Sequence, residues 1–195
     1  MVAGNQAAGR QRILHQAQQL FLAHGYHGVS IRDIVQACGL SNAALYYHFE
    51  NKQNLFVEVF KNYVAVVAQQ LQEAGARQGS CRERLASMAE AHAHFMLKSR
   101  SELHTLLRDL MQCDSEEIRQ LIPEAKGQIP SMFASVMEEG IADGEIRPLD
   151  AQRVSVLLLG MISSLTAHCT YDKVGATLTE DVDLAISTLF EGIGS

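Results

Sequence analysis

The residues of this sequence best suited to chemistry are polar side chains between Ser30 and Lys52. Asn42 carries an amide that can exchange paired hydrogen bonds with a nucleobase. Ala43 beside it is small enough to approach a base edge and contact a thymine methyl group. Side chains that could donate hydrogen bonds to phosphate oxygens follow at Tyr46, Tyr47, His48 and Lys52. These residue types at this spacing favour contact with double-stranded DNA.

Two short helices joined by a glycine-containing turn would position these side chains. Ser30 can cap the first helix, with Asp33 three residues later as in a capping box. Gly39 can close that helix in the left-handed conformation, and Ser41 can cap a second helix expected over about 42–48. This pattern predicts a helix-turn-helix, whose second helix enters the major groove. The alternative is a plain helical hairpin whose tyrosines only pack against neighbouring residues.

The rest of the chain has helical periodicity and shows no strand pattern, so we expect an all-α protein of about nine helices. The long fourth helix should run from Asn51 to about residue 74. Pro123 and Pro130 are expected to punctuate the chain, separating a short helix that ends near Ile122 from one over about 124–142. The last helix is expected over about 180–192. Leu40, Leu45 and Phe49 should face inward from the helix-turn-helix.

From Arg12 to about Phe60 the sequence resembles, without a gap, the TetR (TetR/AcrR) family of transcriptional regulators. The pieces that carry the resemblance are Gly25-Tyr26-x-Gly28, Ser30-Ile31-Arg32-Asp33-Ile34, Gly39-Leu40-Ser41, Leu45-Tyr46-Tyr47-His48-Phe49 and Asn51-Lys52-x-x-Leu55. A later segment, Gly140-x-x-x-Gly144-Glu145-Ile146-Arg147, resembles the turn before the family's dimerisation helices. The resemblance implies a repressor that a small, largely apolar ligand releases from its operator.

The resemblance also implies roles for individual residues. Ser30, Ile31 and Arg32 would lie where the first helix of the motif meets DNA. Ser41, Asn42 and Ala43 would lie at the start of the recognition helix, with Asn42 and Ala43 at base-contacting positions. Phosphate contacts are implied for Tyr46, Tyr47, His48 and Lys52. Because the family often has glycine or threonine at Ala43 or Ala44, the operator sequence does not follow from the chain.

The charge distribution agrees with a DNA-binding module attached to a body that does not touch DNA. The net charge of the 195 residues is −6. Residues 1–55 hold four basic and two acidic side chains, a net charge of +2, whereas the remainder has a net charge of −8. We therefore predict a DNA-binding domain over 1–50, linked by the helix over about 51–74, and a ligand-binding and dimerisation domain over 51–195.

Two-fold DNA sites need two modules about 34–36 Å apart, so the protein is expected to act as a homodimer. The two C-terminal helices carry broad apolar surfaces, which could instead pack only within their own subunit. The resemblance implies that they form a four-helix bundle across two subunits. The interface residues we predict are Leu157, Met161, Ser164, Leu165, Ile186, Leu189 and Phe190.

The middle helices are expected to enclose a pocket for an unidentified small-molecule effector, because methionines adapt to irregular apolar ligands. The lining residues we predict are Met88, His92, Phe95, Met96, Leu110, Met111, Phe133, Met137 and Met161. Acyl-CoA, drugs and aromatic acids would all suit such a pocket. Any one of these side chains, taken singly, is more often ordinary core than pocket lining.

The sequence contains few motifs that would support a metal site or an enzyme active site. His92 and His94 diverge on a helix, and no HxxxH, HExxH or CxxC occurs, so no metal or cofactor is expected. A site across helices from His92, His104 and His168 with Cys113 or Cys169 stays open, as does oxidant sensing through Cys113 or Cys169. A small helical enzyme is the rival class, but no nucleophile–base spacing or glycine-rich phosphate loop is present. Without an apolar leader or a membrane-length apolar run, a cytoplasmic location is expected.

Overall fold

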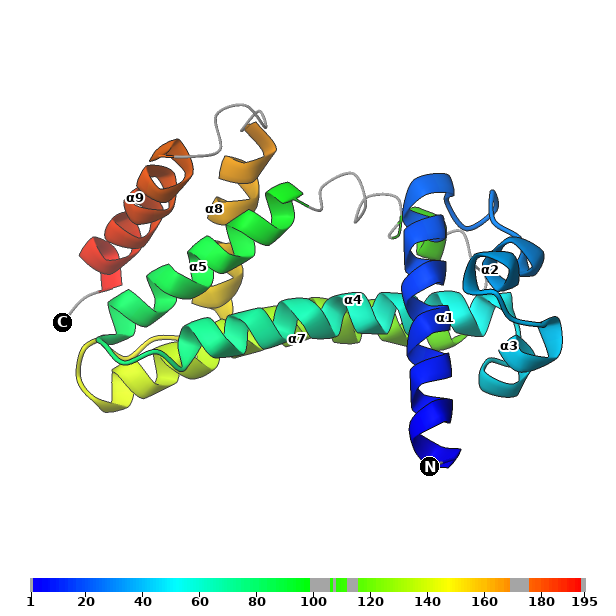
Figure 1. Ribbon diagram of the computed structural model, residues 1–195. Coiled ribbons are helices and arrows are strands. Elements are labelled where there is room, and N and C mark those ends of the chain that lie inside the picture. Colours follow the sequence, from blue (N-terminus) through cyan, green and yellow to red (C-terminus); the bar gives the residue numbers. More distant parts are fainter. Residues whose placement is uncertain (1, 99–105, 107, 112–115, 169–175, 194–195) are drawn as a thin grey trace. The chain divides into compact units, whose positions relative to one another are not determined.

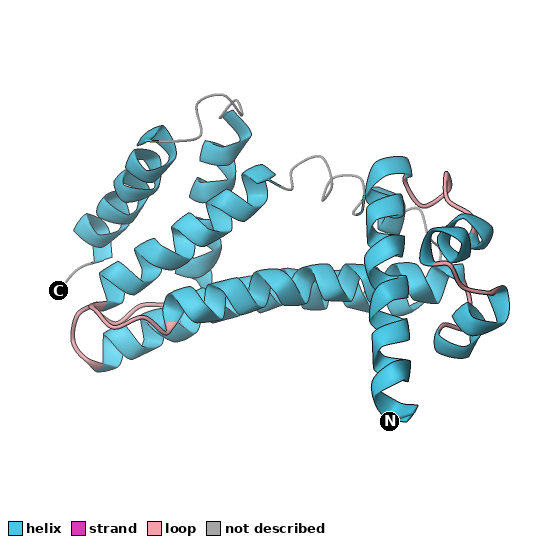
Figure 2. Ribbon diagram, in the orientation of Figure 1, coloured by secondary structure: helices cyan, strands magenta, loops and turns pink. Residues whose placement is uncertain are grey.

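Helices are the regular elements of this protein in the computed structural model, which describes residues 2–98, 106, 108–111, 116–168 and 176–193. Eight helices have both ends within these residues, and residues 108–111 are helical as well. Figure 2 shows the helices joined by loops, which confirms the all-α class predicted from the periodicity. The chain divides into two compact units, Met1–Ala65 with Ser101–Gln120, and Val66–Arg100 with Leu121–Ser195.

The first unit is built on α1 (Val2–His24), α2 (Ile31–Cys38), α3 (Asn42–His48) and the first half of α4 (Lys52–Gly75). α1 contacts both α2 and α3, which also contact each other. The fully buried apolar side chains of this unit come from all four helices and include Ile13, Phe21, Ile34, Leu45 and Phe56. The rings of Phe21 and Phe56 meet edge-to-face at 5.0 Å, so α4 begins in the same core as α1.

Side-chain caps define the short helices of this unit. The Ser30 hydroxyl accepts from the Asp33 amide at 3.2 Å, and the Asp33 carboxylate accepts from the Ser30 amide at 2.8 Å, which confirms the predicted capping box. Gly39 closes α2 with a φ of 61°, in the left-handed region that glycine favours. Ser41 caps α3 by accepting from the Ala44 amide at 3.2 Å, and Asn51 accepts from the Asn54 amide at 2.8 Å at the start of α4.

The second unit contains the end of α4, α5 (Cys81–Lys98), most of α7 (Glu116–Ala142), α8 (Ala151–His168) and α9 (Ala176–Ile193). α5 packs against α8 and α9, which also pack against each other (Figure 1). One apolar cluster joins all five helices, with Leu71, Leu85, Phe133, Leu158 and Val182 fully buried in it. The unit is therefore a helical bundle around a single core.

The predicted break of the chain at the prolines is wrong. α7 runs from Glu116 to Ala142 and contains both Pro123 and Pro130. A proline removes one backbone donor and crowds the preceding turn, but its φ is compatible with a helix. Downstream of Pro130, the buried side chains of Phe133 and Met137 hold the helix in the core, which offsets the lost hydrogen bonds. α9 also begins at Ala176, before the start that we predicted.

Gly140 lets the end of α7 lie directly against the start of α5. A Cβ atom at Gly140 would lie 2.6 Å from the Cys81 sulfur. The Cys81 thiol donates to the Val136 carbonyl at 3.3 Å, and the Cys81 amide donates to the Glu145 carboxylate at 2.8 Å. Burial, reinforced by the charge of Glu145, raises the pKa of the Cys81 thiol to about 11. The thiol therefore serves as a small core group, protonated at neutral pH.

Replacing this glycine tests the close approach of the two helices. Gly140→Ala should lower the free energy of unfolding by about 1–3 kcal/mol, because the added methyl overlaps Cys81 in a packed core. Gly127→Ala is the matched control in α7, since a Cβ there meets no described atom within 4 Å. It should raise stability by up to about 1 kcal/mol through helix propensity. Urea unfolding measures both changes, and equal effects of the two variants would contradict this packing.

Candidate nucleic-acid interface

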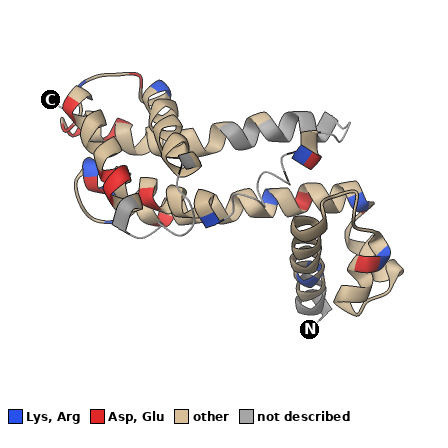
Figure 3. Cartoon of the chain, turned by 90° about the horizontal axis from the view of Figure 1, so that it is seen from above, with Lys and Arg blue, Asp and Glu red and all other residues tan. Residues whose placement is uncertain are grey.

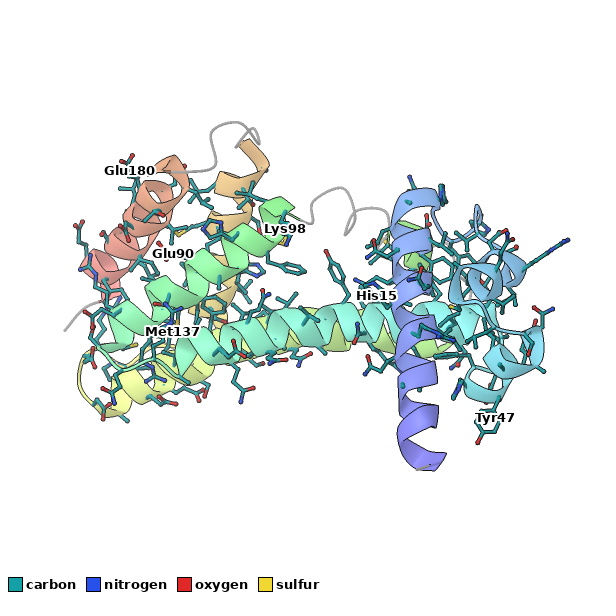
Figure 4. The ribbon with its side chains drawn as sticks, in the orientation of Figure 1. His15, Tyr47, Glu90, Lys98, Met137 and Glu180 are labelled. Atoms are coloured by element: carbon teal, nitrogen blue, oxygen red, sulfur yellow. The ribbon has the colours of Figure 1, made fainter. Side chains whose placement is uncertain are left out.

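The recognition helix α3 has one face in the core and one face in solvent. Leu45 and Phe49 are fully buried, as predicted, and Leu40 before the helix is half-buried. On the other side, Tyr46 is 52% exposed and Tyr47 is 68% exposed. Asn42 and Ala43 are also exposed, and Figure 4 shows Tyr47 projecting outward from α3. The structure thus presents one polar face of α3 to a partner.

We call the exposed face of this module the DNA-contact surface and define it by the residues predicted from the sequence. Most of its members are exposed, while Ile31, His48 and Lys52 are half-buried. The surface consists of Ser30, Ile31, Arg32, Ser41, Asn42, Ala43, Tyr46, Tyr47, His48 and Lys52.

The two capping serines of this surface differ in what they can still donate. The Ser30 hydroxyl donates to Asp33 at 2.6 Å, and the Ser30 amide donates to the same carboxylate. These hydrogen bonds from Ser30 lower the pKa of Asp33 and hold the carboxylate in place. Both donors of Ser30 are therefore engaged in the cap, whereas the Ser41 hydroxyl acts as an acceptor for Ala44 and can still donate its own proton.

Lys52, the first residue of α4, lies over an aromatic side chain that the sequence reasoning did not assign to the surface. Its ammonium nitrogen is 4.2 Å from the centre of the Tyr26 ring, within the range of a cation–π interaction. The Tyr26 ring in turn packs on Phe56 at 4.8 Å and Phe21 at 6.0 Å. Tyr26 thus joins Lys52 to the core, and only tertiary packing could reveal it, because the two residues are 26 positions apart in the chain.

Arg10 on α1 is a second residue that the sequence analysis left out. Its guanidinium lies 5.2 Å from the centre of the Phe49 ring, at the end of α3, and forms an ion pair with Glu58. Figure 3 shows the helices of this unit mostly uncharged, with isolated basic and acidic segments. The positive charge available to DNA is therefore thinly spread.

The predicted pocket residues separate into two groups. Met88, His92, Phe133 and Met137 are buried in the second unit, where Met137 is labelled in Figure 4, and Phe95, Met96 and Met161 are half-buried there. Leu110 and Met111 belong to the first unit instead, with Leu110 fully buried and Met111 77% exposed. Leu110 and Met111 thus belong to a different unit from the other predicted pocket residues, and their place in a shared pocket stays a prediction.

A hollow of about 360 Å³ opens between α4, α5 and α7 of the second unit. Met88 is the member of the predicted set that lines it, together with residues such as Leu71, Met132 and Val136. Arg84 lies at this hollow and donates to the Gly75 carbonyl at 2.7 Å, closing the end of α4. The Arg84 guanidinium also pairs with Glu139 at 2.6 Å.

His92 is a buried polar side chain in apolar surroundings. It is 9% exposed, its ring meets Phe133 edge-to-face at 6.4 Å, and its Nδ1 atom has no hydrogen-bond partner among the described residues. Burial lowers the pKa of His92 from 6.5 to about 4, so the imidazole is neutral at pH 7. Nowhere in the described residues do three potential metal ligands cluster. His104, Cys113 and Cys169 and the side chain of His168 lie outside the described part.

The predicted interface residues on α8 and α9 also differ in exposure. Leu157 is 65% exposed and Ser164 is exposed, while Met161, Leu165, Leu189 and Phe190 are half-buried. Ile186 is 2% exposed and lies in the apolar cluster of its own unit, so its burial needs no second subunit. Val156 on α8 and Leu184 on α9 are also exposed apolar side chains, and the sequence analysis did not include them in the interface.

Two family models match the sequence over most of its length. Residues 13–59 match the one described as bacterial regulatory proteins, tetR family, and residues 78–168 match the tetracyclin repressor-like, C-terminal domain. The HTH-type transcriptional repressor KstR2 of Mycolicibacterium smegmatis is 28% identical over 148 residues, which are 73% of this chain and 69% of that protein.

Solved structures share the fold. A TetR-family transcriptional regulator from Mesorhizobium loti MAFF303099 superposes with a TM-score of 0.78 at 20% identity, over 97% of this chain and 98% of the other. FadR of Bacillus subtilis, solved in complex with stearoyl-CoA, superposes with a TM-score of 0.73 at 21% identity, over 94% of this chain and 98% of the other.

The fold and its exposed recognition helix define a helix-turn-helix DNA-binding transcriptional regulator. The chain belongs to the TetR family of bacterial regulatory proteins, as its sequence resemblance implied. None of the described helices combines the length and the apolar character that crossing a bilayer requires.

The burial of His92 predicts a pH dependence of stability. Its pKa is lower in the folded protein than the usual 6.5, so the unfolded chain binds the proton more readily. Stability should therefore be lost as the pH falls from 6.5 towards 4, by about 3 kcal/mol at the lower end. His92→Leu should remove this loss and be at least as stable as wild type at pH 7, because no buried nitrogen is left unpaired.

Urea unfolding at several pH values measures the effect. His94→Leu, on the exposed side of the same helix, is the matched control. If His92→Leu lost the same stability on acidification as the wild type, the assignment of this titration to His92 would be wrong.

Proposed function

We propose that this regulator is a repressor whose two DNA-binding modules leave their operator when a small, largely apolar ligand binds. The DNA-binding domain in this proposal comprises residues 1–50, and residues 51–195 form the domain for ligand binding and dimerisation. The observation that carries the proposal is a capped helix, α3, with Leu45 and Phe49 buried and a polar face exposed. Double-stranded DNA fits such a helix in its major groove.

The exposed residues divide into two roles at the operator. Asn42 and Ala43 begin α3, the end of a recognition helix that contacts base edges in this motif. Contacts to phosphate oxygens set the register of the protein on the duplex. The donors for these contacts are proposed to come from Arg32, Ser41, Tyr46, Tyr47, His48 and Lys52. Ser30 and Ile31 shape the start of α2, because both donors of Ser30 are used in its cap.

A homodimer follows from the symmetry of such sites and from the exposed apolar side chains of the C-terminal helices. Two modules must lie about 34–36 Å apart to enter successive major grooves. Leu157 and Leu184 are exposed on α8 and α9, and a Cβ at Gly160 would meet open space, so another helix could approach α8 closely there. The two helices are therefore proposed to bury these faces against the same helices of a second subunit.

The effector is proposed to bind in the second unit, among the helices α5, α7 and α8. Support comes from the adaptable methionines Met88, Met96 and Met161 and from the buried, neutral imidazole of His92. In the FadR structure the ligand is stearoyl-CoA, an acyl chain on a polar carrier. The ligand acts by population shift, favouring a conformation in which the two recognition helices no longer match the operator. Acting on the chromosome, the protein would be cytoplasmic.

DNA binding is tested with DNA selected from a random-sequence pool by the wild-type protein. Tyr46→Ala and Lys52→Ala should each weaken binding by about five- to tenfold at 0.15 M salt, because each removes a phosphate contact. The control is Arg77→Ala, which removes one exposed positive charge from the second unit. Gel-shift titration measures the affinities. Wild-type affinity in both Tyr46→Ala and Lys52→Ala would remove the support for this surface.

The dimer is tested by placing a charge on the exposed faces of α8 and α9. Leu157→Glu and Leu184→Glu should each raise the dimer dissociation constant by about tenfold or more, because a carboxylate would be buried without a partner. Val66→Glu, at an exposed apolar position on α4, is the control and should leave the dimer intact. Analytical ultracentrifugation measures the constants, and unchanged dimers in both α8 and α9 variants would argue against this interface.

A further inference from the structure

A carboxylate from the middle of the chain is bound into the DNA-binding module. Residues 101–120 belong to the first compact unit, although the segments on either side of them belong to the second. Asp109 in this stretch is 4% exposed, and its Oδ2 atom accepts a hydrogen bond from the Tyr26 amide at 2.6 Å. These two residues are 83 positions apart. The bond therefore ties the turn after α1 to a segment that follows α5 in the chain.

Asp109 is held in place by hydrogen bonds to both carboxylate oxygens and by close packing against Gly25. The Arg108 guanidinium donates to its Oδ1 atom at 3.1 Å, so both carboxylate oxygens have partners. Gly25 has a φ of 71°, and a Cβ there would lie 2.9 Å from the Asp109 carboxylate. A buried negative charge at the C-terminal end of a helix is normally unfavourable. The charge-assisted bonds from Tyr26 and Arg108 offset that cost.

The Tyr26 side chain continues this contact to the DNA-contact surface. Its peptide is held by Asp109, and its ring packs on Phe56 at 4.8 Å. The ammonium of Lys52 lies 4.2 Å from the centre of the same ring. Displacing the Tyr26 peptide would displace the ring, and with it the platform that holds the Lys52 ammonium. A continuous chain of contacts thus runs from Asp109 through Tyr26 to Lys52.

We infer that Asp109 is a positioning residue for DNA binding, which acts through Tyr26 to place the ammonium of Lys52 for its phosphate contact. The inference rests on the proposed function, in which Lys52 binds a phosphate. The inference adds a residue outside the helix-turn-helix to the DNA-binding machinery, because Asp109, which would place Lys52 for its phosphate contact, lies outside residues 1–50. A purely structural Asp109 would stabilise the module without changing how many phosphates it contacts.

The salt dependence of DNA binding separates these two roles. The slope of log K against log salt counts the phosphates that the protein neutralises, at about 0.9 per contact. A variant that is only less stable keeps the wild-type slope. Each of the two modules loses one contact, so Lys52→Met should reduce the magnitude of the slope for the dimer by about 1.8, and Asp109→Ala should reduce it by a similar amount. The double variant should fall no further than Lys52→Met alone, because both changes remove the same contact.

Further variants keep the test decisive. Asp109→Asn preserves the shape of the side chain and one acceptor oxygen, so this variant should fold even if Asp109→Ala does not. It should lower the slope by a measurable amount that is smaller than the effect of Asp109→Ala. Tyr26→Leu removes the ring and should act like Asp109→Ala, whereas Tyr26→Phe keeps the ring and should retain the wild-type slope. Glu50→Gln makes the same change of charge at an exposed position and corrects for net charge.

The measured slopes test the role of Asp109 separately from the proposed phosphate contact of Lys52. A wild-type slope in Lys52→Met would show that Lys52 makes no phosphate contact, which overturns the proposed role of Lys52 and this inference together. A lowered slope in Lys52→Met with wild-type slopes in Asp109→Asn and Asp109→Ala would overturn the inference alone. Slopes lowered in Lys52→Met, Tyr26→Leu and the Asp109 variants, but not in Tyr26→Phe, would establish it.

Discussion

The burial of Leu45 and Phe49 against the other helices of the first unit is the interaction on which the DNA-contact surface depends. α3 has 7 residues, which is far too short for a helix to persist in water by itself. Its order comes from the buried side chain of Leu45, from Phe49 buried directly after the helix, and from the Ser41 cap at its start. Because a helix carries its faces at fixed angles, burying Leu45 necessarily turns Tyr46 and Tyr47 towards solvent. Stability and recognition are thus two consequences of one packing arrangement.

A low local charge makes this recognition helix dependent on the rest of the chain. Phosphate contacts supply much of the affinity of DNA-binding proteins, yet residues 1–55 carry a net charge of only +2 from four basic and two acidic side chains. Each cation must therefore be well placed, and in the proposed homodimer two modules share the task of binding DNA. The contacts that run from Asp109 through Tyr26 to Lys52 serve the placement of a cation, and the exposed apolar residues of α8 and α9 form the surface that we propose for dimerisation.

Capping and turn residues predicted the local structure of this protein well, and long-range packing accounts for the predictions that are wrong. The capping box of Ser30 and Asp33, the left-handed Gly39 and the cap at Ser41 all involve residues within a few positions of each other. The predicted helix boundary at the prolines is wrong for α7, because the burial of side chains elsewhere in the helix outweighs the energetic cost of the two prolines. Periodicity marked Ile186 and Met111 as apolar but could not tell which surface each would meet: Ile186 fills its own core, and Met111 is exposed.

The sequence by itself determined the all-α class, the helix-turn-helix and the residues along its polar face, because spacing and caps act over one or two helical turns. Only the tertiary structure decided that Asp109 binds the Tyr26 amide, that Tyr26 lies beneath Lys52, and that His92 is buried with an unpaired Nδ1 among the described residues. These facts depend on which helices meet and at what distance. That choice is made by the packing of apolar surface over the whole chain, which no short stretch of sequence encodes.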